Sequence, residues 1–251
     1  MVNEPFVEPR HVVDVGDCYF YHTVDVPGHG VMRGEWDLRA NLDAYFGHYD
    51  FAARRVLDVG TASGALTFHA ERKGADVVSY DLSDGHSWDI VPFANLDRGA
   101  TDAARRQHIR RVNNGYWFCH RVFASRAKVV YGIAYDIPDA IGEVDVAVYG
   151  GILLHLRDPF LALERGARLA RRAIIVTEIC RHGRFGRWLG NPKFVPRPTR
   201  PDQFDTWWNL PPRPVRDYLA ILGFPKSTVT WHRQLFLGRP TTMYTIVARR
   251  D

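Results

Sequence analysis

Short hydrophobic runs alternate with segments of helical pattern from Arg54 onward. Each run is rich in Val and Ile at consecutive positions, which is typical of strands buried on both faces of a parallel sheet. Five runs have this character: RVLDVG (55–60), DVVSYDL (76–82), KVVYGIA (128–134), VDVAVYG (144–150) and RAIIVTE (172–178). Strands separated by helices predict an α/β domain with a parallel sheet.

Two further runs close the chain, VTWHRQLF (229–236) and TMYTIVARR (242–250). The linking residues LGRPT are too few for a crossover helix, so we expect an antiparallel hairpin at the sheet edge. Cap residues predict three helices between the strands. They extend from Ser63 to Gly74, from Asp158-Pro159 through FLALERGARLA, and from Pro214 to Gly223.

Composition is typical of a globular protein, with 251 residues, 46% hydrophobic and 24% charged. The absence of a linker or repeat predicts one domain over 54–251, preceded by an N-terminal extension, 1–53. No hydrophobic run approaches the ~20 residues of a membrane span. The N-terminus MVNEPFVEPR lacks the pattern of a signal peptide. We therefore expect a cytoplasmic protein without a membrane partner.

Cysteine content and charge narrow the chemistry only a little. Cys18, Cys119 and Cys180 lie far apart with no CxxC pair, which favours reduced thiols over a disulfide framework. No His, Cys or carboxylate cluster has metal-ligand spacing, so no metal is predicted. A net charge of +5 permits a nucleic-acid partner, but the excess is small and spread along the chain. The partner must be inferred from motifs.

The first predicted strand ends in a loop of small residues, Asp58-Val59-Gly60-Thr61-Ala62-Ser63-Gly64. Small residues let the backbone turn tightly against a ligand, and the following helix offers unpaired N–H groups. Asp81 ends the second strand, where a carboxylate can accept two hydrogen bonds from a ribose diol. The loop lacks the second glycine of G-x-G-x-x-G, and Asp58 suits an ammonium group better than a pyrophosphate. A cationic amino-acid nucleoside is therefore favoured over NAD.

This pattern resembles the first two motifs of class I S-adenosylmethionine (SAM)-dependent methyltransferases, D/E-x-G-x-x-x-G and an acid ending the next strand. The similarity extends from about Arg54 to Arg250. DVAVYGGILLHLRDPFLALERGARL and CYFYHTVDVPGHGVMRGEWDLR resemble segments of a subset that includes tRNA wobble-uridine methyltransferases and many small-molecule enzymes. The resemblance implies a Rossmann-like, seven-stranded, mostly parallel sheet with helices on both faces and SAM across the strand ends.

The resemblance also assigns SAM contacts along the strand ends. They are Asp58, Gly60, Thr61, Ala62 and Gly64 for the methionine part, Asp81 and Leu82 for the ribose, and Ile133, Ala134 and Gly150. One position departs from the family, which commonly has an Asp on the adenine amino group where this chain has Ile133. Either the backbone at Ile133 and Ala134 contacts the adenine while Asp136 supports the loop, or the adenine sits differently.

Two histidines are candidate bases. His155 follows the fourth strand, at the rim where ligands collect in open α/β sheets. Its imidazole can take the proton of an attacking hydroxyl, or it can be a buried residue that fastens the turn 156–159. His22 is the rival base, and its neighbour Tyr21 is a candidate acceptor contact.

Other candidates each have a structural alternative. Arg39 can pair with the SAM carboxylate or form an exposed salt bridge. Trp88, Phe93 and the pair Trp207-Trp208 can wall an acceptor pocket or lie in the core. The segment 181–200 has six basic and no acidic residues with interleaved aromatics. It can hold a nucleic-acid strand, fold as a lid over a small acceptor, or be a solvated loop.

The sequence thus predicts a SAM-dependent methyltransferase that acts by in-line displacement at the sulfonium methyl, with a hydroxyl group of a sugar or secondary metabolite as the nucleophile. A methyltransferase acting on RNA is the first alternative. The second is a non-catalytic module of the same fold that binds a nucleoside or a protein partner.

Overall fold

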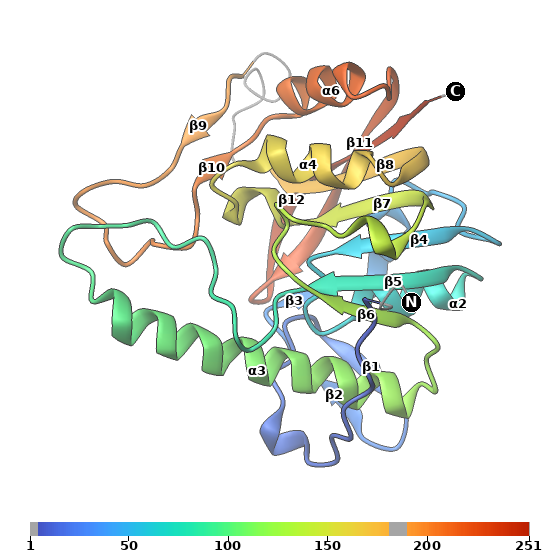
Figure 1. Ribbon diagram of the computed structural model, residues 1–251, viewed down its shortest axis with the longest axis vertical. Helices are drawn as coiled ribbons and strands as arrows, with labels where there is room; N and C mark the ends of the chain where they lie inside the picture. Colours follow the sequence, from blue (N-terminus) through green and yellow to red (C-terminus); the bar gives the residue numbers. More distant parts are fainter. Residues whose placement is uncertain (1–4, 181–189, 251) are drawn as a thin grey trace.

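The computed structural model describes residues 5–180 and 190–250. Over these residues an eight-stranded sheet has the order β3-β11-β12-β8-β7-β4-β5-β6 (Figure 1). The strands are β3 (Trp36–Asp37), β4 (Arg55–Val59), β5 (Asp76–Asp81), β6 (Lys128–Tyr131), β7 (Val144–Gly150), β8 (Ala170–Ile179), β11 (Lys226–Phe236) and β12 (Arg239–Arg249). Strands β4 to β8 pair in parallel, whereas β12 pairs antiparallel with β8. The predicted α/β fold class is confirmed.

The C-terminal hairpin is confirmed and is longer than predicted. Strands β11 and β12 pair antiparallel from Phe236↔Arg239 to Lys226↔Arg249. Only Leu237 and Gly238 lie between them, both with positive φ (47° and 74°), as a twisted two-residue hairpin turn requires. The hairpin does not form the whole edge, because β3 pairs with the end of β11. This short strand from the N-terminal segment is the addition to the predicted seven.

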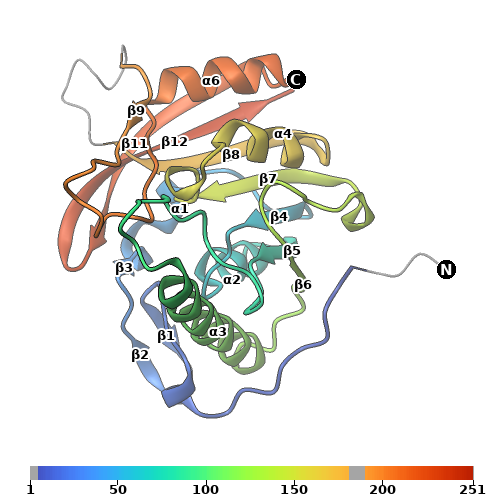
Figure 2. The same ribbon diagram turned by 60° about the vertical axis from the view of Figure 1, so that its left-hand side comes forward.

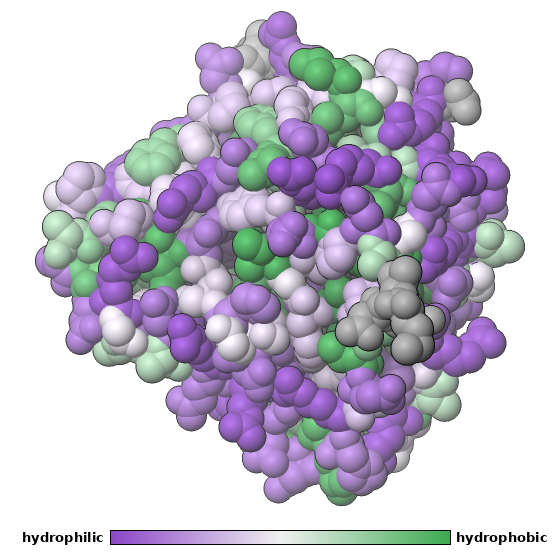
Figure 3. Space-filling model, viewed as in Figure 1, coloured by the Kyte–Doolittle hydropathy of each residue, from purple (hydrophilic) through white to green (hydrophobic). Residues whose placement is uncertain are grey.

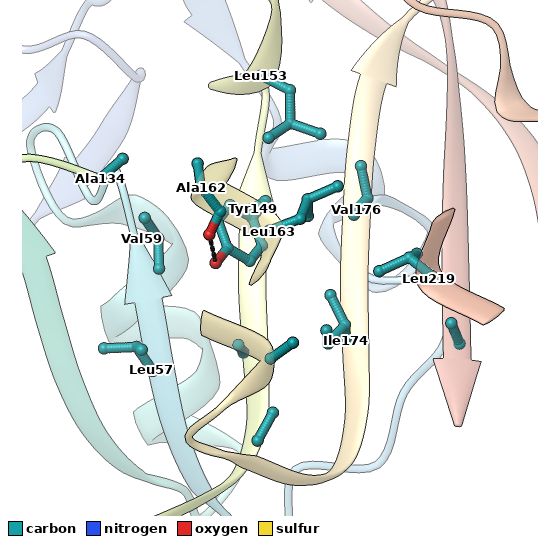
Figure 4. Close-up of a cluster of buried hydrophobic side chains, with 14 of the residues drawn as sticks. Leu57, Val59, Ala134, Tyr149, Leu153, Ala162, Leu163, Ile174, Val176 and Leu219 are labelled. Atoms are coloured by element: carbon teal, nitrogen blue, oxygen red, sulfur yellow. Dashed lines mark hydrogen bonds between the residues drawn. The ribbon is translucent and has the colours of Figure 1, made fainter. Parts of the chain in front are cut away.

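Helices cover both faces of the sheet (Figures 1 and 2). They are α1 (Leu42–Tyr45), α2 (Ala65–Arg72), α3 (Arg98–Val122), α4 (Pro159–Ala167) and α6 (Pro212–Ile221). Leu163 of α4 and Leu219 of α6 pack in one hydrophobic cluster with the sheet (Figure 4). Leu66 of α2 belongs to a second cluster, together with Tyr45 of α1. The sheet is therefore the middle layer of three.

Consecutive strand residues divide between these two layers. Leu57 and Ile174 join the cluster under α4 and α6, while their neighbours Val56 and Ile175 join the cluster under α1 and α2. Side chains of a strand point alternately to opposite faces, so a strand covered on both faces needs hydrophobic residues at every position. Burying each such side chain contributes roughly 1.5–3 kcal/mol.

Helix caps agree with the sequence at one site and differ at two. The carboxylate of Asp158 accepts from the Leu161 N–H, and Pro159 is the first residue of α4, as predicted. Helix α6 begins at Pro212, two residues before the predicted start. The prediction that Ser63 caps α2 is wrong, because Gly64 occupies the cap position in a left-handed conformation (φ 86°).

The remaining elements are short. Two small antiparallel sheets pair β1 (Val24–Val26) with β2 (Gly30–Met32) and β9 (Lys193–Phe194) with β10 (Trp208–Asn209). The 3-10 turns are η1 (Val15–Asp17), η2 (Arg39–Asn41), η3 (Asp139–Ile141) and η4 (Leu153–His155). The face seen in Figure 3 is mostly hydrophilic, with separate hydrophobic patches. Across the described residues, no helix has both the length and the hydropathy needed to cross a bilayer.

Candidate functional site

The carboxyl ends of β4, β5 and β7 meet at one edge of the sheet. In the sheet, β5 lies on one side of β4 and β7 lies on its other side, so the strand order reverses at β4. Open α/β sheets bind their ligands at such a switch point. A cavity of about 440 Å³ opens here. The predicted site residues that line it are Tyr21, His22, Gly60, Ala62, Asp81, Leu82, Trp88, Ile133, Ala134, Gly150 and His155.

The loop after β4 turns through left-handed conformations at Gly60 (φ 81°), Ala62 (φ 49°) and Gly64 (φ 86°). A side chain at Gly60 would come within 2.5 Å of Ile152, so only glycine keeps this backbone open to the cavity. Gly64 lies outside the cavity lining, and a Cβ there would meet the Phe68 ring at 2.4 Å. Glycine at this position therefore lets the start of α2 pack closely against the Phe68 ring.

Ser63 connects the loop to the N-terminal segment instead of capping the helix. Its hydroxyl oxygen lies 3.2 Å from the backbone nitrogen of Tyr21 and 3.4 Å from that of His22, and accepts from both. This contact brings two residues of the N-terminal extension to the rim of the loop. The extension is thus part of the cavity wall.

The Asp81 carboxylate is oriented by two backbone N–H groups. Its Oδ2 accepts from Ala62 at 2.6 Å and its Oδ1 accepts from Leu82 at 2.7 Å. Burial raises the pKa of Asp81 to about 6, and the two N–H donors oppose that rise. Each carboxylate oxygen has a second acceptor direction. The group can therefore accept two further hydrogen bonds, as from a diol.

Asp58, predicted as a ligand contact, lies behind the loop and is not among the residues that line the cavity. Its Oδ2 accepts from the Thr67 hydroxyl at 2.7 Å, and the Thr61 hydroxyl lies 2.8 Å from that of Thr67. Thr61, predicted as a ligand contact, is likewise a buried support of the loop. Burial raises the pKa of Asp58 to about 6, and the charge of nearby Asp81 adds to this.

One oxygen of Asp58 has no partner. Among the described residues, Oδ1 is buried without a hydrogen bond. An unsatisfied buried carboxylate oxygen costs free energy, and a cation placed beside the loop lowers that cost. The site therefore fits a nucleoside that carries an ammonium or sulfonium group.

Tyr80 supports the loop that the sequence assigned to the adenine. Its hydroxyl lies 2.9 Å from the carbonyl oxygen of Ile133 and 3.1 Å from that of Asp136. A Cβ at Gly132 would lie 2.2 Å from the same hydroxyl, which explains the glycine. The expected support by Asp136 comes from its carbonyl and not from its carboxylate. Ile133 is 40% exposed and lines the cavity with an apolar side chain.

His155 is the last residue of η4, directly after β7. Its Nδ1 lies 2.5 Å from the carbonyl oxygen of Asp205. A carbonyl can only accept, so Nδ1 carries a proton, and Nε2 is the ring nitrogen whose lone pair can accept one. The ring of Trp88 lies alongside, with centroids 6.3 Å apart. His155 therefore holds the loop at Asp205 in place, whereas the sequence predicted that it would hold the turn 156–159.

Glu178 holds the turn that carries His155. It is the penultimate residue of β8, is 1% exposed, and its Oε1 accepts from the N–H of Leu153 at 2.7 Å. Burial raises the pKa of Glu178 to about 8, and backbone donors, with Leu153 the first of them, oppose the rise. The carboxyl group of Glu178, on β8, therefore caps the N-terminal end of η4.

His22 is the second imidazole of the cavity. It is 4% exposed, and its Nδ1 is buried without a partner among the described residues. Burial lowers the pKa of His22 to about 4, so the ring is neutral at pH 7. Neutral His22 is able to accept a proton, as is His155 through its Nε2.

Polar and aromatic groups complete the lining. The carboxylate of Glu35 accepts from the Tyr19 hydroxyl, and the His108 ring lies 4.5 Å from that of Tyr19 and 5.7 Å from that of Trp88. Asp205 lines the same cavity. Burial and the Glu35 charge raise the pKa of the cavity residue Tyr21. These groups offer hydrogen-bond acceptors beside flat apolar surfaces, as sites for polar small molecules do.

Two further predicted contacts, Arg39 and Trp207, also lie outside the cavity lining. Arg39 pairs at 2.7 Å with both Asp25 and Asp37, in the exposed salt bridge that was its alternative interpretation. Trp207 is buried and donates from Nε1 to the Asp89 carbonyl at 2.6 Å. It supports the wall from behind, which agrees with its core interpretation.

The basic segment 181–200 falls partly outside the described residues, because 181–189 are not described. Its described part contains β9, where Phe194 is exposed and lies 5.7 Å from the Trp208 ring. Within the described ranges no group of three metal-ligating side chains occurs.

Several residues of the site were not predicted from the sequence. Tyr80, Glu178 and Glu35 lie in or beside predicted strands and motifs, yet no spacing rule marks them. A single polar residue at the end of a buried strand, as at Glu178, is the one available signal. It indicates a hydrogen-bonding role without saying to what.

Comparisons by sequence find no matching protein-family model and no matching curated protein. The fold is similar to that of the N-terminal domain of EvdMO1, crystallised in the presence of SAH and D-fucose. That match has 16% identity over 91% of this chain and 90% of the other, with a TM-score of 0.53.

Two further structures are similar. Magnesium protoporphyrin IX methyltransferase from Synechocystis PCC 6803, with bound SAH, is 14% identical over 83% of this chain and 80% of the other, with a TM-score of 0.51. Human N-acetylserotonin methyltransferase in complex with SAM is 15% identical over 85% of this chain and 52% of the other, also with a TM-score of 0.51. At these identities the likeness is one of fold.

Proposed function

We propose that this protein is a SAM-dependent methyltransferase that acts on a hydroxyl group of a small polar acceptor, such as a sugar or secondary metabolite. The observation that carries the proposal is one cavity that joins the glycine loop to the Asp81 carboxylate, with an unpartnered Asp58 oxygen behind it. The solved structures of similar fold that contain SAM or SAH support the cofactor.

The character of the lining supports a small hydroxylated acceptor. Glu35 and Asp205 can accept hydrogen bonds from hydroxyl groups, and Trp88 offers an aromatic face. The volume of about 440 Å³ lies in the range of small-molecule sites. D-fucose, present in a structure of similar fold, is a molecule of this class.

The residues would divide the work as follows. SAM, when bound, supplies a methyl group on a positively charged sulfur. Asp81 would hold the ribose, and the loop at Gly60 and Ala62 would receive the methionine part. His155 would take the proton of the attacking hydroxyl at Nε2, while Asp205 fixes its Nδ1–H. General-base assistance of this kind contributes roughly 10²–10⁴ in rate, and alignment of the reactants supplies the rest.

Calorimetry with SAM, SAH and NAD tests the cofactor. We expect SAM and SAH to bind and NAD not to bind. Asp81→Ala should weaken SAH binding at least about tenfold, since two charge-assisted hydrogen bonds are lost. Asp76→Ala is the matched control at the other end of β5, where the side chain is 68% exposed. Equal SAH affinity in both variants, or tight NAD binding, would contradict the assignment.

The composition of the segment 181–200 keeps an RNA acceptor as the second candidate, in line with the tRNA methyltransferase resemblance. An RNA enzyme would lose affinity steeply with salt, and replacing Arg184, Arg187 and Lys193 by Ala would lower the slope by up to ~0.9 per phosphate contact. If the acceptor is a small molecule, the wild-type protein and this triple variant should both retain negligible RNA. SAH binding without methyl transfer to any acceptor would favour the non-catalytic alternative.

A further inference from the structure

Arg105 is the unexplained charge of the cavity. It lies on α3 and is the one Arg or Lys side chain in the cavity lining formed by the described residues. Neither a hydrogen bond nor a salt bridge joins its guanidinium to any described side chain. The nucleoside site, made of the glycine loop and Asp81, does not account for it.

Aromatic rings hold this cation in place. The guanidinium carbon of Arg105 lies 4.7 Å from the ring centroid of Trp88 and 4.7 Å from that of Phe204. Stacking uses the flat face of a guanidinium and leaves its N–H groups to donate elsewhere. Two stacked rings also restrict its motion, so less entropy is lost when a ligand is bound.

The carboxylates of the cavity already have other donors. Glu35 accepts from the Tyr19 hydroxyl, Asp89 from the Tyr135 hydroxyl, and Asp205 from the Thr206 hydroxyl. None of them forms an ion pair with Arg105 among the described residues. Burial and the Arg105 charge lower the pKa of His108, so this neighbouring ring is neutral at pH 7. Arg105 is therefore the side chain that provides positive charge in this part of the cavity lining, beside the neutral His108 ring.

We propose that Arg105, stacked on Trp88 and Phe204, binds an anionic group of the methyl acceptor, a carboxylate or a phosphate. This inference rests on the proposed function. A guanidinium matches either anion with two parallel hydrogen bonds, which a neutral hydroxyl cannot provide. The acceptor class is then a hydroxylated acid, with its hydroxyl groups near Glu35 and Asp205 and its anion at Arg105.

Four sugars with one ring test the proposal: D-galactose, D-galacturonate, D-galactose 6-phosphate and D-galactosamine. Each is titrated into the SAH-saturated protein and followed by calorimetry. D-galacturonate or D-galactose 6-phosphate should bind at least about tenfold tighter than D-galactose, and whichever does so identifies carboxylate or phosphate. Equal binding of all four, or tightest binding of cationic D-galactosamine, would overturn the proposal.

Variants of Arg105 test whether this residue causes the preference for an anionic sugar. Arg105→Gln should abolish it, and Arg105→Lys should keep only part, because Lys lacks the two-pronged geometry. Arg106→Gln, an exposed neighbour on the same helix, should keep it fully. SAH affinity should be unchanged in all three. A preference that survives Arg105→Gln, or a loss of SAH affinity in that variant, would overturn the proposal, the latter by assigning Arg105 to the cofactor carboxylate.

The two proposals fail in different ways. If the wild-type protein binds no SAH, the proposed function is wrong. Titration of the sugars into the unliganded protein then still reports whether Arg105 selects an anion.

Discussion

His155 donates from Nδ1 to the carbonyl oxygen of Asp205, 2.5 Å away, and this one bond decides which ring nitrogen can accept a proton. The bond links the turn after β7 to a loop that lies fifty residues further along the chain. It orients the imidazole in the cavity through a backbone carbonyl rather than a carboxylate.

His155→Gln should lower the rate of methyl transfer by roughly 10²–10⁴ while SAH affinity stays nearly constant. The measurement is turnover at saturating SAM together with calorimetry of SAH. His22→Gln is the matched variant, and it should lose less than His155→Gln. A deficit below about tenfold in folded, SAH-binding His155→Gln protein would remove His155 as the base, and a large deficit in His22→Gln would transfer the role.

SAH binding near pH 6 should release protons. Asp58 and Asp81 have pKa values raised to about 6 by burial, so both are partly protonated there. An ammonium group on the cavity side of the loop favours the ionised form of Asp58 and lowers its pKa, so protons leave on binding and affinity rises from pH 5 to 7. Calorimetry in buffers of different ionisation enthalpy measures the release. It should be smaller in Asp58→Asn and absent at pH 8; uptake of protons would contradict the interpretation.

In the Glu178→Gln variant, the free energy of unfolding should decrease less steeply with rising pH above neutrality than in the wild-type protein. The folded pKa of Glu178 is raised by burial to about 8, so the folded state holds its proton after the unfolded state has lost it. Its contribution is complete below its ordinary pKa and disappears as pH rises to about 8. His22, Asp58 and Asp81 titrate below pH 6.5 in the folded state. Denaturant unfolding between pH 6.5 and 8.5 measures the slope, and parallel curves for both proteins would contradict the prediction.

Gly132→Ala should destabilise the protein by about 1–3 kcal/mol, the usual cost of overpacking. The new Cβ would lie 2.2 Å from the Tyr80 hydroxyl and 2.9 Å from its ring. Gly85→Ala is the control, because its nearest neighbour lies at 3.4 Å. Thermal and denaturant unfolding measure both variants. A Gly132→Ala protein as stable as Gly85→Ala would mean that Tyr80 moves aside freely.

The sequence predicts the parts of this fold that depend on local pattern. Consecutive hydrophobic residues mark β4 to β8 because both faces of these strands are covered, and Asp158-Pro159 marks a helix start because the cap forms within four residues. The Ser63 cap fails for a long-range reason. Its hydroxyl accepts from Tyr21 and His22, whose arrival beside the loop no local pattern predicts.

The site residues also divide into those that a local sequence pattern predicts and those that depend on long-range contacts. Gly60 and Asp81 are visible in the sequence because each stands at the end of a predicted strand, where the turn needs a glycine and a carboxylate can meet a ligand. Arg39 shows the opposite case, since acids near it in the chain and in β1 satisfy it away from the cavity. Arg105 carries no signal in a helix rich in arginine, and only the positions of Trp88 and Phe204 distinguish it.

The pairing of β3 with β11 has a consequence for biosynthesis. Trp36 near the start of the chain and Phe236 near its end both line the cavity, with ring centroids 4.7 Å apart. During translation the first of these residues leaves the ribosome long before the second. The nascent chain can form the parallel strands early, but one wall of the cavity stays open until β11 has emerged. The wall of the cavity that contains Trp36 and Phe236 is therefore complete only after β11 has been synthesised.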